Sequence, residues 1–209
     1  MSSSYNRIAG HSIERLAALS DGLFAVAMTL LVLDLRVPAA AAIHGEGDLL
    51  HALAALAPQL VVYLMSFLTL GIFWVGQQTQ LNHLARADRD IAWIHLMFLF
   101  AVTLMPFSTR LMTAYLAYRA ALLVYWGNIL LLGAALFASW RCATHSGLVR
   151  ADAPEGIGPA VERRILIAQG LYALGAALCV FSTYWSLGFI VLVQLNYAFA
   201  PRLGRLRAR

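Results

Sequence analysis

The chain has 209 residues, of which 61% are hydrophobic and only 12% are charged, and its mean hydropathy is +0.74. A soluble domain is about half apolar and about one quarter charged, so this composition excludes an ordinary soluble protein and indicates an integral membrane protein. The formal net charge of +5 rests on fifteen basic residues, all of them arginine. Most arginines lie between apolar runs or in the C-terminal tail, which favours a role in topology and predicts no nucleic-acid partner.

Several apolar runs reach the ~20 residues that a hydrocarbon layer of ~30 Å requires. We therefore predict an all-α membrane protein, a single domain over residues 1–209 with six transmembrane helices. The N-terminal residues have no cleavable apolar core after them, so no signal peptide is expected. Residues 165–200 are too long for one span and barely long enough for two, and we expect the break between the last two helices near residues 182–184. The predicted helices cover, approximately, residues 11–36, 53–82, 91–112, 118–140, 162–181 and 185–200.

The first apolar run, residues 22–33, is closed by Asp21 on one side and Asp34 on the other. Within it, only the hydroxyl of Thr29 hydrogen-bonds strongly. A carboxylate about one turn into a membrane helix is costly unless a partner or water meets it, so Asp21 predicts a functional position. Asp34 would concentrate cations at the mouth of a pore; the alternative is a carboxylate in water at a helix end.

Val26, Thr29, Leu30 and Leu33 occur at i, i+3, i+4 and i+7, which places them on one face of a helix. Several copies of this face around an axis would form a narrow apolar constriction with a ring of hydroxyls. One copy of six helices rarely encloses such an axis, so a pore implies an oligomer, with cyclic symmetry the usual choice. The alternative is an ordinary helix–helix packing face.

Arg15 and Asp21 are six residues apart and do not share a helix face, so an ion pair within one helix is not expected. Each needs a partner elsewhere in the fold. The second predicted helix ends in polar residues, and Trp74, Gln77 and Gln78 are the candidate partners. These side chains predict a network that packs the first helix against the second.

Turn signals separate the remaining helices. Pro58 lies in the first turns of the second helix, where a missing N–H is tolerated, and Pro106 lies near the end of the third. Residues 39–51 are predicted to form a loop, and residues 86–90 a solvated turn. The longest predicted loop covers residues 141–162, which contain two prolines and three glycines.

The cysteines and histidines show no metal-ligand spacing. Cys142 and Cys179 lie in or beside apolar segments and are expected to be packed thiols. His44 and His51 accompany acids in a predicted loop but lack a ligand constellation. His95, near the start of the third helix, is either an interfacial hydrogen-bonding residue or a proton sensor. We expect no metal site and no cofactor, and potassium only as a permeant ion.

The arginines also predict the orientation of the chain. With a cytoplasmic N-terminus, twelve of the fifteen lie inside, and only Arg36, Arg110 and Arg119 lie outside. This positive-inside bias predicts an inner (plasma) membrane protein with both termini in the cytoplasm. The arginine-rich tail after Pro201 is either a topology anchor or a site for anionic lipid head groups.

The first helix carries a motif of a known family. It begins Arg15-x-x-x-Leu19-Ser20-Asp21 and continues through residues 22–33, which resembles the Arg-x-x-x-Phe-Ser-Asp signature of the prokaryotic transmembrane protein 175 family. By this resemblance, Arg15, Ser20 and Asp21 correspond to a network that holds the first helix against its neighbours. The likeness covers the first three helices well and the last three only in general pattern. Two further fragments match the family: Phe73-Trp74-Val75 and Leu104-Met105-Pro106-Phe107-Ser108-Thr109.

The resemblance implies a potassium-selective channel, a homotetramer of six-helix subunits whose pore is lined by the first helix of each. The Thr-Val-Gly-Tyr-Gly loop of ordinary potassium channels is absent from this chain, as it is from the family. Carried over by position, the apolar constriction falls on Val26, with Leu30 and Leu33 one and two turns further out. The hydroxyl ring that contributes to selectivity falls on Thr29. Membrane lipids and potassium ions are the other expected partners.

Three departures from the family pattern matter. The aromatic residue of the signature is Leu19 here, which loses ring packing but stays apolar. Gln77 and Gln78 stand where the family often has histidines, and glutamine does not titrate near neutral pH, so pH dependence resting on those histidines is not expected. Val26 is smaller than the isoleucine or leucine usual at the constriction, which predicts a wider pore.

Other functions compete with the channel. A secondary transporter, with or without proton coupling, is one alternative, although transporters usually show interrupted helices near the midplane and internal repeats. A membrane enzyme using Ser20 and Asp21 is another, but adjacent helical residues diverge by ~100°, which makes a poor catalytic dyad, so no enzyme is expected. A purely structural membrane protein is the third.

Overall fold

The computed structural model describes residues 12–206, with side chains described through residue 199. The predicted start of the first helix at His11 and the side chains of the arginine tail lie outside these described residues. The described part of the chain is helical, with 3₁₀ turns and one isolated bridge between Leu84 and Val149. Its elements are α2 (Ile13–Leu31), η1 (Val32–Asp34), η2 (Ala40–Ala42), α3 (Glu46–Ala55), α4 (Ala57–Asn82), α5 (Arg89–Thr103), α6 (Met105–Ala114), α7 (Arg119–His145), α8 (Ile157–Ala177), η3 (Leu178–Val180) and α9 (Thr183–Leu206).

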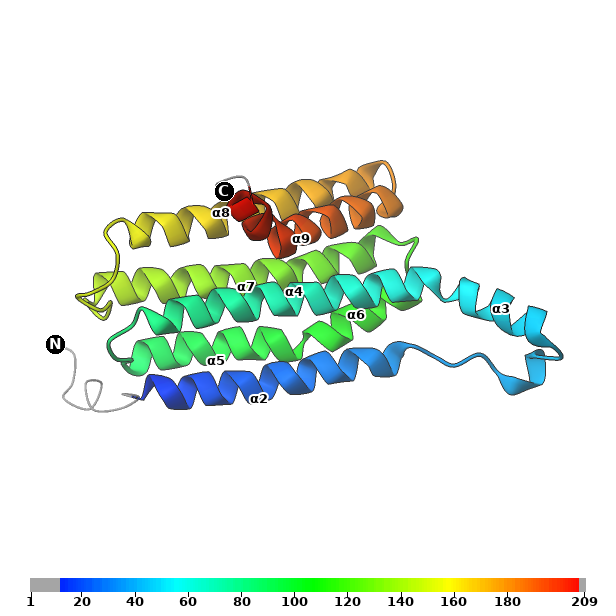
Figure 1. The fold of residues 1–209 in the computed structure, drawn as a ribbon, viewed down its shortest axis with the longest axis horizontal. Helices are drawn as coiled ribbons and strands as arrows, with labels where there is room; N and C mark the ends of the chain where they lie inside the picture. Colours follow the sequence, from blue (N-terminus) through cyan, green and yellow to red (C-terminus); the bar gives the residue numbers. More distant parts are fainter. Residues whose placement is uncertain (1–11, 207–209) are drawn as a thin grey trace.

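The helices form an elongated bundle in layers (Figure 1). Helix α2 lies along one edge and contacts α4, α5 and α6, while the α8–α9 hairpin lies along the opposite edge, where α8 packs on α7 and α9 packs on α4. Within the described residues, five stretches are long and apolar enough to cross a membrane: Ile13–Asp34, Ala57–Asn82, Arg89–Ala114, Arg119–His145 and Ile157–Val180.

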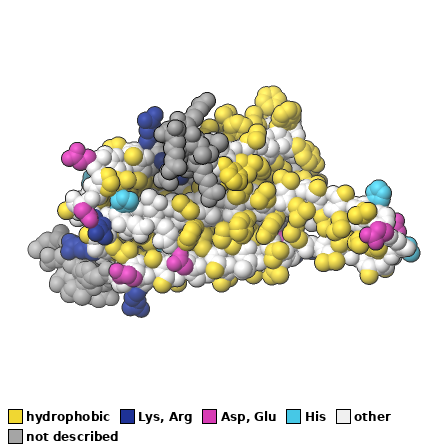
Figure 2. Space-filling model, viewed as in Figure 1, with side chains coloured by type: hydrophobic (Ala, Val, Ile, Leu, Met, Phe, Trp, Pro, Cys, Tyr) yellow, Lys and Arg dark blue, Asp and Glu magenta, His cyan; other side chains and the backbone are white. Residues whose placement is uncertain are grey.

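The surface agrees with a membrane-embedded bundle. Figure 2 shows hydrophobic side chains along the middle of the bundle, with most charged side chains towards its two ends. Helix α3 projects beyond the bundle at the end where α2 finishes, and its acids Glu46 and Asp48 lie in its first turn. Acidic side chains stabilise a helix N-terminus, so residues 46–51, predicted as part of a loop, begin a helix instead.

The third predicted helix is broken into α5 and α6 at Leu104, two residues before Pro106. Proline has no N–H to donate to the carbonyl four residues earlier, so the ladder is interrupted here. Asn128 of α7 lies against the break. In the amide orientation that satisfies both groups, it donates to the Ala101 carbonyl (3.0 Å) and accepts from the Met105 N–H (3.2 Å). These two backbone groups would pair with each other in an unbroken helix, so Asn128 replaces the lost bond.

The other boundaries shift by a few residues. Helix α7 continues to His145 and α8 begins at Ile157, so the predicted loop 141–162 shortens to residues 146–156. Gly156, with φ of 79°, precedes α8 in the left-handed conformation that favours glycine. The last two helices are divided at residues 181–182, beside the expected break near 182–184.

A small second core closes the end of the bundle where α2 begins. It contains Leu81, Leu84, Ala87, Ile91, Ala143 and Leu148. The α4–α5 turn is tied to the α7–α8 loop by bonds from Ala85 N to Leu148 O (2.8 Å) and from Arg150 N to His83 O (2.9 Å). The predicted solvated turn at 86–90 is therefore partly buried, because Ala87 belongs to this core.

Glycine allows the α8–α9 hairpin to pack closely at one position. A Cβ atom on Gly175 would lie 2.9 Å from Cγ1 of the fully buried Ile190 and 3.0 Å from the Phe189 ring. We expect Gly175→Ala to destabilise the protein by about 1–3 kcal/mol, because a rigid ring and a packed side chain must both move. Thermal unfolding of purified protein in detergent measures the effect.

The matched control is Gly170→Ala on the same helix, where a Cβ would meet nothing within 4 Å. This change should leave stability unaltered or raise it by up to about 1 kcal/mol through helix propensity. Equal melting temperatures for the two variants would show that the close approach at Gly175 is not required.

Candidate pore-lining site

One face of α2 is left uncovered by the rest of the described chain. Val26 is 54% exposed and Leu33 72%, whereas Phe24 and Ala27, on the opposite side of the helix, are each 2% exposed. Leu30 is also exposed. The face predicted from the sequence is thus not used for packing inside the subunit. In a membrane protein, such a face meets lipid, water or another subunit.

Thr29 lies on the same exposed face, and its hydroxyl hydrogen is used locally. Oγ1 is 2.9 Å from the Ala25 carbonyl and 2.9 Å from the Val26 carbonyl, so the O–H donates back to its own helix. The lone pairs of the oxygen remain free to face away from the backbone. A hydroxyl in this state offers an acceptor but no donor, which suits a cation and not an anion.

Small residues continue this face towards the start of α2. Ala18, Gly22 and Ala25 are exposed, and a Cβ on Gly22 would meet nothing within 4 Å. Small residues let membrane helices from different chains approach closely. The exposed face of α2 is therefore slim at Ala18, Gly22 and Ala25 and bulkier at Val26 and Leu30.

Asp21 receives two hydrogen bonds from α4. Trp74 Nε1 and Gln78 Nε2 each donate to its Oδ1 over 2.8 Å. Two of the three candidate partners therefore contact the carboxylate directly and tie α2 to α4 near the start of the exposed face. Charge-assisted bonds of this kind are about twice as strong as bonds between neutral groups.

Ser20 forms a second, fully buried contact. Its Oγ donates to the Leu16 carbonyl (2.7 Å), accepts from Gln77 Nε2 (3.1 Å) and lies 2.7 Å from His95 Nε2. Since the hydroxyl hydrogen goes to Leu16, the His95 tautomer that satisfies the pair carries its proton on Nε2. Helix α2 is therefore joined to both α4 and α5 at this level.

A serine at 2.7 Å from a histidine is also the arrangement of an activated nucleophile. Here Ser20 is fully buried, with no exposed surface, and its hydrogen is directed at a backbone carbonyl. No substrate can reach the oxygen without unpacking α2 from α4 and α5. The geometry thus describes a packing contact and gives no support to a hydrolytic site.

Two other residues predicted from the sequence, Arg15 and Asp34, take no part in the hydrogen bonds of Asp21 and Ser20. The Arg15 side chain is exposed, and among the side chains described, those of residues 12–199, none pairs with it. Asp34, predicted at the pore mouth, lies 3.9 Å from Arg110 Nε of α6, and its side chain is 18% exposed. The pairing reduces the net negative field that Asp34 alone would produce at this end of α2.

Comparison with known proteins connects this geometry to a family. A family model described as the endosomal/lysosomal potassium channel TMEM175 matches residues 15–106. A protein named potassium channel from Streptomyces collinus is 36% identical over 194 residues, 88% of this chain and 91% of that protein. Another, from Chamaesiphon minutus, is 31% identical over 188 residues, 88% of this chain and 92% of that protein. The chain belongs to the TMEM175 family.

A solved structure of the TMEM175 family has the same fold. The crystal structure titled as a lysosomal potassium-selective channel TMEM175 homolog from Chamaesiphon minutus superposes with a TM-score of 0.79 and 28% identity, covering 91% of this chain and 98% of that one. The mouse protein named endosomal/lysosomal proton channel TMEM175 is 31% identical over 109 residues, which is 50% of this chain but 22% of the mouse protein. The predicted family is confirmed.

The TMEM175 family match covers nearly all of α2, all of α3, α4 and α5, and the start of α6, so it includes the exposed face and the contacts of Asp21 and Ser20, while Arg110, the partner of Asp34, lies beyond it. The residue that sequence reasoning placed least well is His95, which was expected as an interfacial residue or a sensor. Its partner Ser20 lies 75 residues away. The available signal was that a ring nitrogen in an otherwise apolar run needs a hydrogen-bond partner.

Proposed function

We propose that this chain forms a potassium-selective channel, a homotetramer in which α2 of each subunit lines a central pore. The observation that carries the proposal is the uncovered face of α2, on which apolar side chains alternate with an outward-facing acceptor at Thr29. Val26 forms the constriction, with Leu30 and Leu33 further out. An apolar ring gates by dewetting, and hydroxyl oxygens replace part of the hydration shell of the ion.

The proposal includes six transmembrane helices, with α9 (Thr183–Leu206) as the sixth. It packs against α4 and α8, and η3 joins it to α8. An even number of crossings places both termini on one side, and the arginine distribution favours the cytoplasm. The protein would then lie in the plasma membrane with α3 outside the cell.

Potassium is preferred over protons as the permeant ion for two reasons. The relatives that align along 87–88% of this chain are named potassium channels, while those named proton channels align along about half of it. The exposed α2 face also carries no titratable side chain between Asp21 and Asp34 along which protons could be relayed.

The decisive experiment is bilayer recording of purified protein under opposed potassium and sodium gradients. We expect unitary current steps that reverse near the potassium equilibrium potential. Smooth, saturable flux with fixed stoichiometry would instead identify a transporter. A reversal potential that follows an imposed pH gradient would identify protons as the permeant ion, and the absence of any current would favour a structural role.

The selectivity test is Thr29→Ala, recorded under the same gradients. The potassium/sodium permeability ratio should fall about two- to tenfold, the effect of losing a contact worth about 0.5–1.5 kcal/mol. The matched control is Thr103→Ala on α5, where an exposed hydroxyl likewise donates to its own helix, at the Phe100 carbonyl (2.7 Å). An unchanged ratio in Thr29→Ala would remove the hydroxyl ring from the selectivity mechanism.

A further inference from the structure

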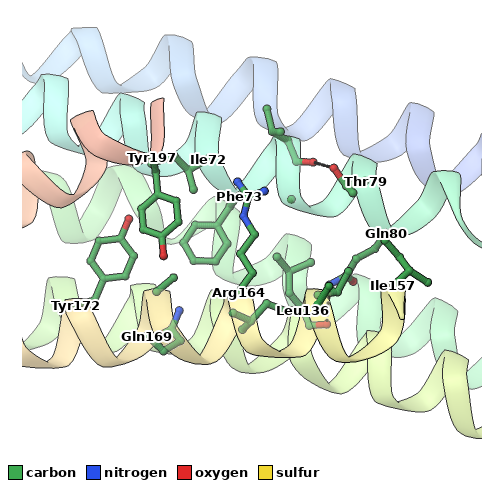
Figure 3. A pocket seen from close by; sticks show the side chains of 16 residues that line it. Ile72, Phe73, Thr79, Gln80, Leu136, Ile157, Arg164, Gln169, Tyr172 and Tyr197 are labelled. Atoms are coloured by element: carbon green, nitrogen blue, oxygen red, sulfur yellow. Dashed lines mark hydrogen bonds between the residues drawn. The ribbon is translucent and has the colours of Figure 1, made fainter. Parts of the chain in front are cut away.

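A cavity of about 230 Å³ lies between α4, α7, α8 and α9, on the side of the bundle away from α2 (Figure 3). Its walls are mostly aliphatic and aromatic, with Phe73 of α4, Leu136 of α7 and Ile165 of α8 among them. The residues that bring polar groups to one part of it are Arg164, Gln169, Tyr172 and Tyr197.

The charges of α8 place the cavity at the level of the membrane surface. Glu162, Arg163 and Arg164 are consecutive charged residues near the start of the helix, and the apolar lining residues Ile165 and Ala168 lie deeper. With the cytoplasmic orientation proposed above, this is the inner leaflet. If α2 lies on the pore axis, the α8–α9 hairpin at the opposite edge of the bundle faces lipid.

The guanidinium of Arg164 is available to an anion. Its Cζ lies 5.9 Å from the centre of the Tyr197 ring, which orients it at the cavity. The neighbouring carboxylate, Glu162, is 3.6 Å from Arg141 instead, and in the part of the chain that the structure describes no carboxylate pairs with Arg164. Arginine recognises phosphate through two parallel N–H bonds, and basic pockets between membrane helices bind anionic head groups.

Deeper in the cavity, two buried polar atoms have no hydrogen-bond partner among the described residues. They are the hydroxyl of Tyr172, a residue that is 1% exposed and lies beside the Gln194 side chain without forming a hydrogen bond of good geometry to it, and Oε1 of Gln169. Polar atoms left unpaired at membrane depth are unfavourable. A phospholipid carries a phosphate and, a few bonds further along, ester carbonyls that accept a hydrogen bond such as that of the tyrosine O–H.

We infer that this cavity binds an anionic phospholipid of the cytoplasmic leaflet. Its phosphate lies at Arg164, an ester carbonyl accepts from Tyr172, and the first part of an acyl chain packs against Phe73 and Ile165. The charge of Arg164 favours an anionic phospholipid over a zwitterionic one such as phosphatidylcholine, because the choline cation of the latter competes with the guanidinium for the phosphate. The Tyr172 hydroxyl, which pairs with an ester carbonyl of either lipid, accounts for the depth of the site.

The test is native mass spectrometry of the purified, delipidated oligomer titrated with dioleoyl phosphatidylglycerol, and separately with dioleoyl phosphatidylcholine. We expect phosphatidylglycerol to bind at least about fivefold more tightly, and Arg164→Gln to weaken its binding about fivefold, the effect of one arginine at a membrane surface. Arg163→Gln is the matched control, since this neighbouring arginine does not line the cavity. It should change the affinity less than about twofold.

Tyr172→Phe is the second variant, because it keeps the ring and removes only the hydroxyl. It should weaken phosphatidylglycerol binding while leaving the assembly intact, which keeps the inference testable if Arg164→Gln assembles poorly. Equal binding of the two phospholipids, or equal losses in Arg163→Gln and Arg164→Gln, would overturn the site. Free oleate binding as tightly as phosphatidylglycerol would overturn the phospholipid as its occupant, and no binding at all would favour coverage by a neighbouring subunit. These readouts do not depend on current, so they stand apart from the channel proposal.

Discussion

Replacing Val26 with Asn should raise the single-channel current about tenfold, which corresponds to a barrier lower by about 1.4 kcal/mol. The physical reason is that, in the proposed tetramer, four apolar side chains facing one axis would exclude water, while four amides of similar size would hold it. The 54% exposure of Val26 within the subunit leaves the side chain free to occupy that position. Planar-bilayer recording in symmetrical potassium measures the effect.

The matched control places the same substitution elsewhere. Val124 of α7 is 44% exposed and lies on a helix outside the α2 layer, so Val124→Asn should leave the current unchanged. Val26→Ile, which enlarges the ring, should lower the current. Equal currents in wild type and Val26→Asn would show that the narrowest point lies elsewhere on α2, at Leu30 or Leu33.

Removing the Asp21 carboxylate should cost assembled protein more than conductance. In Asp21→Ala, Trp74 Nε1 and Gln78 Nε2 both lose their acceptor, and only the Gln77–Ser20 hydrogen bond is left of the side-chain hydrogen bonds described between α2 and α4. We expect the loss to reach at most about 3 kcal/mol per subunit, since the group is partly exposed. Repeated in every subunit, this should reduce the oligomer peak on a sizing column about tenfold or more.

Asp21→Asn provides the rescue. Its side-chain oxygen can still accept both bonds without the charge, so the oligomer yield should recover most of the way to wild type. Both variants giving wild-type yield would show that apolar packing and the Ser20–Gln77 hydrogen bond are enough to hold α2 against α4. A low yield in both would show that the charge itself is needed, which the two bonds to Oδ1 do not explain.

The sequence predicts the α2 face well because helical periodicity is local: Val26, Thr29, Leu30 and Leu33 share a face whatever surrounds them. Trp74, Gln77 and Gln78 were identifiable as partners because polar groups in an apolar run must find acceptors or donors. The contact between His95 and Ser20 was not predicted, since it depends on how α5 packs beside α2 and no spacing in the chain encodes that.

The helix boundaries show the same division between local and tertiary information. From the sequence, Pro106 is predicted to lie near the end of one continuous helix, whereas the helical hydrogen-bond pattern is interrupted at Leu104. The prediction of six helices divides residues 165–200, which are barely long enough for two spans. The structure places the turn between these two helices at residues 181–182. The start of α3 at Glu46 was missed because its Ala- and Gly-containing surroundings resemble a loop.

The break at Leu104 divides the third transmembrane segment into two helices, α5 and α6, and a residue of another helix holds the angle between them. Asn128 of α7 stabilises the break because its amide bonds to both the Ala101 carbonyl and the Met105 N–H, although it contacts neither end of α2. Arg110 of α6 lies beside Asp34, which follows the end of α2, and His95 of α5 contacts Ser20 within α2. The relative position of these two contacts, at Ser20 and at Asp34, therefore depends on the Asn128 amide of α7, one helix further from the exposed face.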